Sequence, residues 1–190
     1  MLAGLDAVRT RQYPLSYDGR WWLDVEQLEA GITPKTKAVV VVNPNNPTGS
    51  YLTEQEYLRV VDVCRKHGLA LVCDEVFADY PISEGGLGGR TLVGRDDVLT
   101  FVFSGLSKVS ALPQMKLGWI VTNGPRQLVL RALAGLELIA DSYLSSGAPV
   151  QWAATRLLEL RHEVQQQIRE RTTANLCCLR TLLAETVFEV

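Results

Sequence analysis

Residues 36–49 read TKAVVVVNPNNPTG, and with the segment that follows them to residue 74 they predict the architecture of the chain. Residues 36–42 are a short β-branched run of the kind that makes a buried strand. Residues 69–73, LALVC, are a second such run, and a helical pattern at residues 53–66 separates the two. Strand, helix and strand in this order predict a βαβ unit whose two strands are parallel.

The predicted helix at residues 53–66 carries its own start and stop signals. Thr53 is suited to cap the N-terminus with Glu56 three residues on as its capping-box partner, and Gly68 is suited to end the helix. The apolar residues predicted to share one face are Leu58, Val61 and Cys64.

Three polar residues lie just past the ends of predicted strands. Asn46 lies in the turn after the first strand, Asp74 follows the second, and Lys108 comes after a third apolar run at residues 98–103. Ligands gather beyond the carboxyl ends of parallel strands, so these side chains are expected to converge on one site. A lysine that opens a Ser/Gly loop at the edge of a buried sheet is desolvated, which lowers the pKa of its amine and makes it more nucleophilic.

An amide, a carboxylate and a lysine in this arrangement suit pyridoxal phosphate. A lysine can form a Schiff base with it, a carboxylate can keep the pyridine nitrogen protonated, and an amide N–H can donate to the phenolic oxygen. Each residue also has a simpler interpretation: residues 43–49 as a turn, Asp74 as a helix N-cap and Lys108 as a solvated loop charge. These interpretations are favoured for each residue alone and less so for all three together.

Four motifs resemble those of the class I/II, fold-type I aminotransferases that use pyridoxal phosphate, particularly the alanine and tyrosine aminotransferases. They are NPNNPTG at 43–49, DEVF at 74–77, SGLSK at 104–108 and KLGW at 116–119. Their order and spacing are similar to the family's along almost the whole chain. The resemblance implies an α/β fold with three α/β/α layers around a mostly parallel mixed sheet, as in the large domain of these transferases.

The resemblance also implies a role for each matching residue. Lys108 would hold the cofactor as a Schiff base and, once displaced by substrate, would carry a proton between the substrate Cα and the cofactor. Asp74 would pair with the pyridinium nitrogen. Asn46 would hydrogen-bond the phenolic oxygen near the substrate carboxylate, and Lys116 would lie against the cofactor phosphate.

The sequence departs from the family pattern at three positions around the cofactor. Phe77 stands where the family generally has a tyrosine that reaches the phenolic oxygen, and Tyr80, one helical turn on, is a candidate substitute. Lys116 stands where an arginine usually grips the phosphate, and a lysine lacks the bidentate fork. Gly105 stands where many relatives place a phosphate-binding hydroxyl. The nearest hydroxyls are those of Ser104 and Ser107.

The length of 190 residues corresponds to about one domain. By resemblance we expect residues 1–190 to be a single, partial cofactor-binding large domain. It would begin after the glycine-rich phosphate turn and end where a small domain with the substrate-binding arginine begins. Residues 1–4 are not expected to begin a signal peptide, and residues 187–190 are expected to start a strand.

Composition narrows the classes of function. With 19 basic and 21 acidic residues the net charge is −2, so no bulk attraction to nucleic acid or to a membrane is expected. No stretch reaches transmembrane length, and a cytoplasmic protein is expected. The cysteines have no metal-ligand spacing and imply no disulfide framework, so they are expected to be buried, reduced and inert. They are Cys64, Cys73, Cys177 and Cys178.

The remaining elements are predicted from shorter signals. In chain order they are an edge strand at 8–13, a turn at 16–19, a short helix at 24–30, a glycine-rich loop at 81–90, a strand at 118–122 and a helix at 125–139. The glycine pairs of the loop lack the spacing of a P-loop or a dinucleotide fingerprint.

Residues 148–185 predict a long amphipathic helix, with a break near residues 147–149. Arginines off its apolar face are interleaved with glutamates, which favours a solvated face over a nucleic-acid or partner surface. By resemblance the helix leads to the absent small domain, so part of its apolar stripe would be exposed and favour self-association. The stripe is Leu157, Leu160, Val164, Ile168, Thr172, Leu176, Leu179 and Leu183.

Three functions remain open from the sequence. The first is an aminotransferase that moves an amino group between an amino acid and a 2-oxo acid through the Lys108 Schiff base. The second is a lyase or synthase with the same cofactor site. The third is a truncated, non-catalytic fragment, which Phe77 and Lys116 favour. The resemblance alone implies a homodimer, and no metal is expected.

Overall fold

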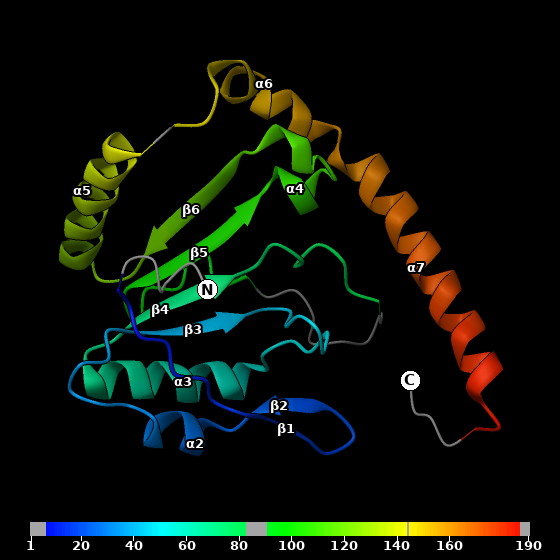
Figure 1. The fold of residues 1–190 in the computed structure, drawn as a ribbon, viewed down its shortest axis with the longest axis horizontal. Coiled ribbons are helices and arrows are strands. Elements are labelled where there is room, and N and C mark those ends of the chain that lie inside the picture. Colours follow the sequence, from blue (N-terminus) through cyan, green and yellow to red (C-terminus); the bar gives the residue numbers. More distant parts are fainter. Residues whose placement is uncertain (1–6, 83–90, 144, 187–190) are drawn as a thin grey trace.

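The computed structural model describes residues 7–82, 91–143 and 145–186, and a mixed β-sheet lies at its centre (Figure 1). Its strands, in spatial order, are β3 (Ala38–Val42), β4 (Ala70–Asp74), β5 (Thr100–Gly105) and β6 (Gly118–Asn123). The first three are parallel, and β6 pairs with β5 antiparallel. The α/β fold with a mostly parallel mixed sheet is therefore confirmed.

Helix α3 (Glu54–His67) connects β3 to β4 and uses both predicted signals. The Thr53 hydroxyl accepts from the Glu56 N–H, and the Glu56 carboxylate accepts from the Thr53 N–H, which completes the capping box. Gly68 ends the helix in the left-handed region at φ 64°, where a residue without a Cβ is favoured.

One face of the sheet packs on α3 and forms the core. The buried strand residues alternate along each strand, as expected for a sheet covered on that side. They include Val39, Val41, Leu71, Cys73 and Val102, and α3 contributes Tyr57, Val60, Val61 and Cys64. Leu58, predicted to share that helix face, is instead 45% exposed. The reason is geometric, since Leu58 lies about 120° around the helix from Cys64.

The opposite face of the sheet, called the open face below, carries exposed apolar side chains. Val40 is 55% exposed, Phe103 37% and Ile120 43%. Helix α5 (Arg126–Ser142) follows β6 and has no buried residue. Asp74 lies on this open face, because it is adjacent in β4 to Cys73, which points into the core.

The N-terminal strands lie further along the chain than predicted. Strands β1 (Leu15–Tyr17) and β2 (Trp21–Leu23) form an antiparallel hairpin, and residues 8–13, predicted as an edge strand, are not part of a strand. The hairpin forms where Gly19, at φ 67°, permits a tight turn. Residues 8–13 contact the sheet through the Tyr13 hydroxyl, which donates to the Val40 carbonyl at 2.8 Å.

The hairpin and the helix after it are fixed to α3. Helix α2 (Val25–Ala30) begins at its N-cap Asp24, as predicted. The buried Glu56 carboxylate accepts from the Leu23 N–H at 3.1 Å and from the Arg20 guanidinium at 3.5 Å. Glu56 therefore connects β2 to the first turn of α3.

Residues 148–183 form two helices, α6 (Ala148–Glu159) and α7 (Arg161–Leu183), where one was predicted. The break predicted near residues 147–149 is the start of α6, and Pro149 lies in its first turn, where a proline is tolerated. The second break follows the Leu157 carbonyl, which accepts from the Ser110 hydroxyl at 3.0 Å. In a continuous helix that carbonyl would accept from the Arg161 N–H.

Only part of the apolar stripe on α7 is covered. Val164 and Ile168 are half-buried, whereas Leu179 is 44% exposed. Figure 1 shows α7 extending along one side of the molecule. Cys177 and Cys178 are exposed on this helix, so the expectation that every cysteine is buried is wrong for these two.

Some predicted features fall outside the described residues. They are residues 83–90 of the glycine-rich loop, the chain start at residues 1–4 and the strand start at residues 187–190. Within the described ranges, no helix combines the length and the apolar character needed to cross a membrane.

Candidate functional site

Asp74 is the last residue of β4, between the ends of two parallel neighbours. Its register partners are Val42 in β3 and Phe103 in β5. The carboxylate is half-buried on the open face, and its Oδ1 accepts from the Val76 N–H at 3.0 Å. Val76 is the hydrogen-bond donor to this carboxylate among the described residues, so the group can accept a further N–H from a ligand on the open face.

Lys108 lies in α4 (Leu106–Val109), a single helical turn that starts where β5 ends. The expectation of a Ser/Gly loop is wrong, because the Ser110 N–H donates to the Leu106 carbonyl at 3.2 Å and closes the turn. The lysine is half-buried, and its Nζ lies 5.3 Å from the centroid of the Phe77 ring. This contact brings the segment after β4 together with the lysine after β5.

Gly105 allows the start of α4 to lie close to the strand beside it. A Cβ at this position would be 2.9 Å from the Leu117 carbonyl oxygen and 3.1 Å from the Gly118 Cα. The Leu106 N–H donates to that same carbonyl at 3.0 Å. A serine or threonine at position 105 would therefore displace the turn that carries Lys108.

The NPNNPTG turn after β3 is held by its own side chains. The Asn43 carboxamide oxygen accepts from the Leu52 N–H at 2.9 Å, and the Asn45 oxygen accepts from the Thr48 hydroxyl at 2.9 Å. The Asn43 N–H also donates to the Asp74 carbonyl at 2.8 Å, which joins the turn to the end of β4. Asn46 is exposed between these anchors, so its amide is available to a ligand.

The Tyr80 hydroxyl is not available to replace that of the tyrosine expected at position 77. Its hydroxyl donates to the Lys108 backbone carbonyl at 2.5 Å. Burial raises the pKa of Tyr80, and the negative charge of Asp79 adds to the increase, so the hydroxyl remains a donor. Tyr80 therefore holds the backbone of the lysine turn.

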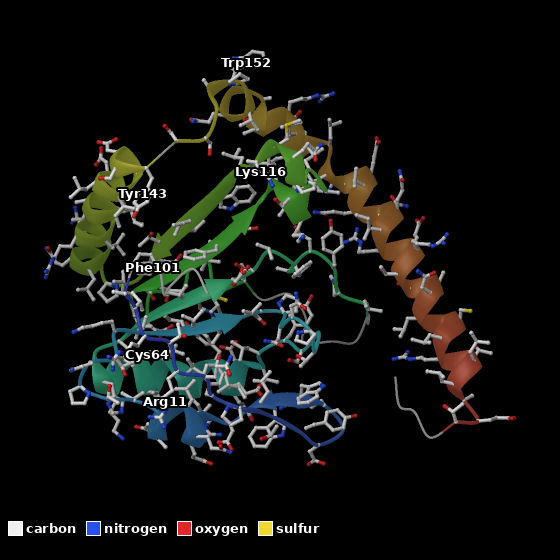
Figure 2. All side chains as sticks on the ribbon, viewed as in Figure 1. Arg11, Cys64, Phe101, Lys116, Tyr143 and Trp152 are labelled. Carbon is white, nitrogen blue, oxygen red and sulfur yellow. The ribbon has the colours of Figure 1, made fainter. Side chains whose placement is uncertain are left out.

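The remaining predicted site residues surround α4 without contacting the lysine amine. Ser104 lies in β5 opposite Trp119, and Ser107 lies in α4 itself. Lys116 is exposed at φ 53° two residues before β6, and Figure 2 shows it at the end of that strand nearest α4. Among the described residues, no hydrogen bond or ion pair joins Asn46, Asp74, Lys108 and Lys116 to one another.

Two residues that the sequence did not single out support the site. Glu75 is buried, and its carboxylate accepts from the Leu92 N–H and the Thr91 hydroxyl, both at 2.6 Å. Gln165 is buried on α7 and donates to the Val109 carbonyl at 2.8 Å. The signal for Glu75 was its place beside Asp74, whereas Gln165 looked like one of three consecutive glutamines on a solvated helix.

Comparison with known proteins gives consistent matches along this chain. The family described as "Aminotransferase class I and II" matches residues 2–190. The glutamate-pyruvate aminotransferase AlaA of Escherichia coli K12 is 33% identical over 133 residues, 70% of this chain and 33% of AlaA. The S-alkyl-thiohydroximate lyase SUR1 of Arabidopsis thaliana is 33% identical over 164 residues, 83% of this chain and 34% of SUR1.

A solved structure gives the same result at the level of the fold. The alanine aminotransferase from Pyrococcus furiosus superposes with a TM-score of 0.73 at 25% identity, over 90% of this chain and 44% of that one. The chain spans about a third of the length of the curated relatives that it matches.

Proposed function

The chain belongs to the class I and II aminotransferases, and from this membership we propose that it takes part in moving an amino group between an amino acid and a 2-oxo acid with pyridoxal phosphate as cofactor. The family resemblance inferred from the four motifs is confirmed. The observation that carries the proposal is local: the half-buried Lys108 amine lies over Phe77 at the strand ends where Asp74 also lies.

The donor set beyond the carboxyl ends of β3, β4 and β5 fits this cofactor. It comprises a primary amine on Lys108, a carboxylate on Asp74 that can accept another N–H, and the exposed amide of Asn46. These are the three groups that an aldehyde, a ring nitrogen and a phenolic oxygen require. Binding of the cofactor phosphate is less well supported, because Lys116 offers a positive charge without the paired N–H donors of an arginine.

When bound, the cofactor supplies an electron sink for the substrate Cα–H bond. The residues of this chain would do the rest. Lys108 would hold the cofactor covalently through Nζ and then move the proton at the substrate Cα. Asp74 would keep the ring nitrogen protonated, and Asn46 would orient the phenolic oxygen. Ser104, Ser107 and Lys116 would bind around the phosphate, and the Phe77 ring would exclude water beside the amine.

We propose a second candidate function, a carbon–sulfur lyase, because one relative supports it. SUR1 is named an S-alkyl-thiohydroximate lyase, and it is similar over a larger share of this chain than AlaA is. The two reactions share the cofactor and the lysine, so the residues described above support both. The choice between them depends on the fate of the amino group.

The assembly and location of the protein are also proposals. We propose a homodimer, supported by the exposed apolar side chains on the open face and on α5. We propose that residues 1–190 are part of a cofactor-binding large domain, with residues 148–185 leading to a small domain. Four free cysteines support a reducing compartment such as the cytoplasm.

The proposed transfer is tested by a single-turnover assay on the chain loaded with pyridoxal phosphate. Alanine or glutamate should convert the cofactor to pyridoxamine phosphate with a stoichiometric yield of 2-oxo acid, and Lys108→Ala should abolish both. Release of a thiol, ammonia and a 2-oxo acid from S-alkyl cysteine substrates, with the cofactor unchanged, would favour the lyase. If neither reaction occurs, the remaining alternative is a truncated, non-catalytic fragment.

A further inference from the structure

Helix α4 is too short to be stable by itself. It has a single turn, and helix formation in isolation is unfavourable at that length. Three hydrogen bonds to other segments hold either this turn or Ser110, the residue that follows it. The Tyr80 hydroxyl donates to the Lys108 carbonyl, Gln165 donates to the Val109 carbonyl, and the Ser110 hydroxyl donates to the Leu157 carbonyl of α6.

Gln165 makes two of the hydrogen bonds that converge here. Its Nε2 donates to the Val109 carbonyl at 2.8 Å and to Oδ2 of Asp79 at 3.0 Å. Asp79 belongs to the segment after β4 that also supplies Phe77. One amide therefore joins the turn that carries Lys108 to the segment that places a ring under the lysine amine.

The position of Gln165 argues against a role in helix packing alone. It is 4% exposed between the half-buried Val164 and Ile168, where an apolar side chain would continue the stripe at no desolvation cost. The neighbouring Gln166 is exposed and pairs with Glu170 at 2.8 Å, which is an ordinary surface contact within the helix. The buried amide matches polar groups that would otherwise lack partners at the end of α4.

We propose that Gln165 is a positioning residue for Lys108, which sets the distance between α4 and the segment of Asp79 and so holds the amine over Phe77. The inference rests on the proposed function for the meaning of Lys108, because the lysine is the residue that would bind the cofactor. Gln165 itself does not touch the reacting atoms. Without its two N–H donors, α4 loosens and the Lys108 amine moves into solvent.

The inference is tested by competitive acetylation of the 190-residue chain with acetic anhydride, read by peptide mass spectrometry. The exposed Lys35 is the internal reference for the reactivity of Lys108. Gln165→Met keeps the length of the side chain and removes both donors. The Lys108 to Lys35 ratio should rise about fivefold, which is the size expected for the loss of a buried hydrogen bond.

Matched variants separate positioning from loss of stability. Gln166→Met should leave the ratio unchanged, and Gln165→His, which keeps an N–H donor, should return it toward the wild-type value. Gln165→Leu is a second variant without the donors, for use where Gln165→Met does not fold. Because Lys35 is already exposed, general unfolding would also raise the ratio, so urea unfolding of each variant is measured beside it and only variants that are folded under the labelling conditions are compared.

The same variants, taken before acetylation, distinguish this inference from the proposed function. Pyridoxal phosphate is added, trapped with borohydride and measured at Lys108, and the trapped fraction should fall in Gln165→Met. A wild-type chain that traps no cofactor would refute the proposed function, and the acetylation ratio would still test the position of the lysine. Equal ratios in Gln165→Met and wild type, or an equal rise in Gln166→Met, would overturn the inference.

Discussion

Phe77 is the residue that separates this site most clearly from the family pattern. Its ring lies 5.3 Å from the Lys108 amine, so it can shield the amine but cannot donate a hydrogen bond to a cofactor oxygen. The Tyr80 hydroxyl is committed to the Lys108 carbonyl and does not replace the missing donor. The amide of Asn46 is then the remaining donor expected for the phenolic oxygen.

Restoring the hydroxyl should therefore strengthen cofactor binding. For Phe77→Tyr we expect the dissociation constant for pyridoxal phosphate to fall about fivefold, the worth of one added hydrogen bond. An absorbance titration measures it. The matched control is Phe101→Tyr in β5, a half-buried phenylalanine further along the strand from the lysine, which should leave the constant unchanged. Weaker binding by Phe77→Tyr would contradict the assignment.

The negative charge of the Asp74 carboxylate should contribute to the affinity for pyridoxal phosphate. Asp74→Asn keeps the shape and removes the partner for a protonated ring nitrogen, and a charge-assisted hydrogen bond contributes about 1.5–3 kcal/mol. We expect cofactor affinity to fall about 10- to 100-fold in the same titration. Asp62→Asn, in a surface ion pair with Arg65 on α3, is the control. Equal affinities of Asp74→Asn and wild type would show that the carboxylate does not hold the ring.

At the scale of elements, local signals predicted the sheet and α3 well. The β-branched runs gave β3, β4 and β5, and the capping box gave the first turn of α3. The errors arise where long-range contacts decide. A strand at residues 8–13 was not formed because pairing followed the turn at Gly19. The helical turn at Lys108 and the break at Leu160 depend on contacts with distant segments, which no local pattern shows.

Glu56 should make the link between β2 and α3 dependent on pH. Burial by itself would raise the pKa of Glu56, but hydrogen bonds from Thr53 and Leu23 outweigh it and hold the pKa below its usual value. Because the pKa of Glu56 is lower in the folded than in the unfolded protein, the ionised carboxylate stabilises the fold at pH values above the unfolded pKa of about 4.3. This contribution is lost as the pH falls through the folded pKa.

Urea unfolding at several pH values measures that contribution. At pH 7 we expect Glu56→Gln to lower the free energy of unfolding by about 1–3 kcal/mol, and the difference from wild type should shrink as the solution is acidified. Glu26→Gln, which removes an exposed partner of Arg59, should change stability by less than about 0.5 kcal/mol. If the difference in the free energy of unfolding between wild type and Glu56→Gln stays constant from neutral to acid pH, the pKa of Glu56 is not lowered in the folded protein.

Gly105 should tolerate no side chain at the contact between β5 and the segment before β6. Gly105→Ala places a Cβ 2.9 Å from the Leu117 carbonyl oxygen, so we expect a loss of about 1–3 kcal/mol in urea unfolding. Gly135→Ala is the matched control, because nothing lies within 4 Å of its added Cβ in α5. There alanine should stabilise the protein by up to about 1 kcal/mol. A neutral Gly105→Ala would disprove the close approach.

For the whole molecule, the motifs predicted the family and the fold, but they did not predict which faces of the sheet and of α5 are exposed. The motifs fixed the order of residues around the lysine, but sequence patterns did not distinguish the covered face of the sheet from the open one. Ile120 is 43% exposed on the open face, and on α5 Leu138 is 70% and Ile139 55% exposed. Apolar surface of this kind favours association.

The apolar surface of α5 should drive self-association of the purified chain. In sedimentation velocity we expect the wild-type chain to form species larger than a monomer as concentration rises. Leu138→Lys should shift the distribution toward the monomer, because a charge would be buried at the contact. Gln127→Lys, at an exposed position of the same helix, adds the same single positive charge and is the control. A wild-type chain that is monomeric at all concentrations would refute this use of α5.

The most direct test of the central claim is to locate the covalent bond to the cofactor. The chain is incubated with pyridoxal phosphate, reduced with borohydride, digested and mapped by peptide mass spectrometry, with Lys108→Ala beside it. We predict the label on the peptide that contains Lys108 and its loss in the variant. Label spread over exposed lysines such as Lys35, equally in both proteins, would contradict the claim that α4 and the end of β4 form a cofactor site.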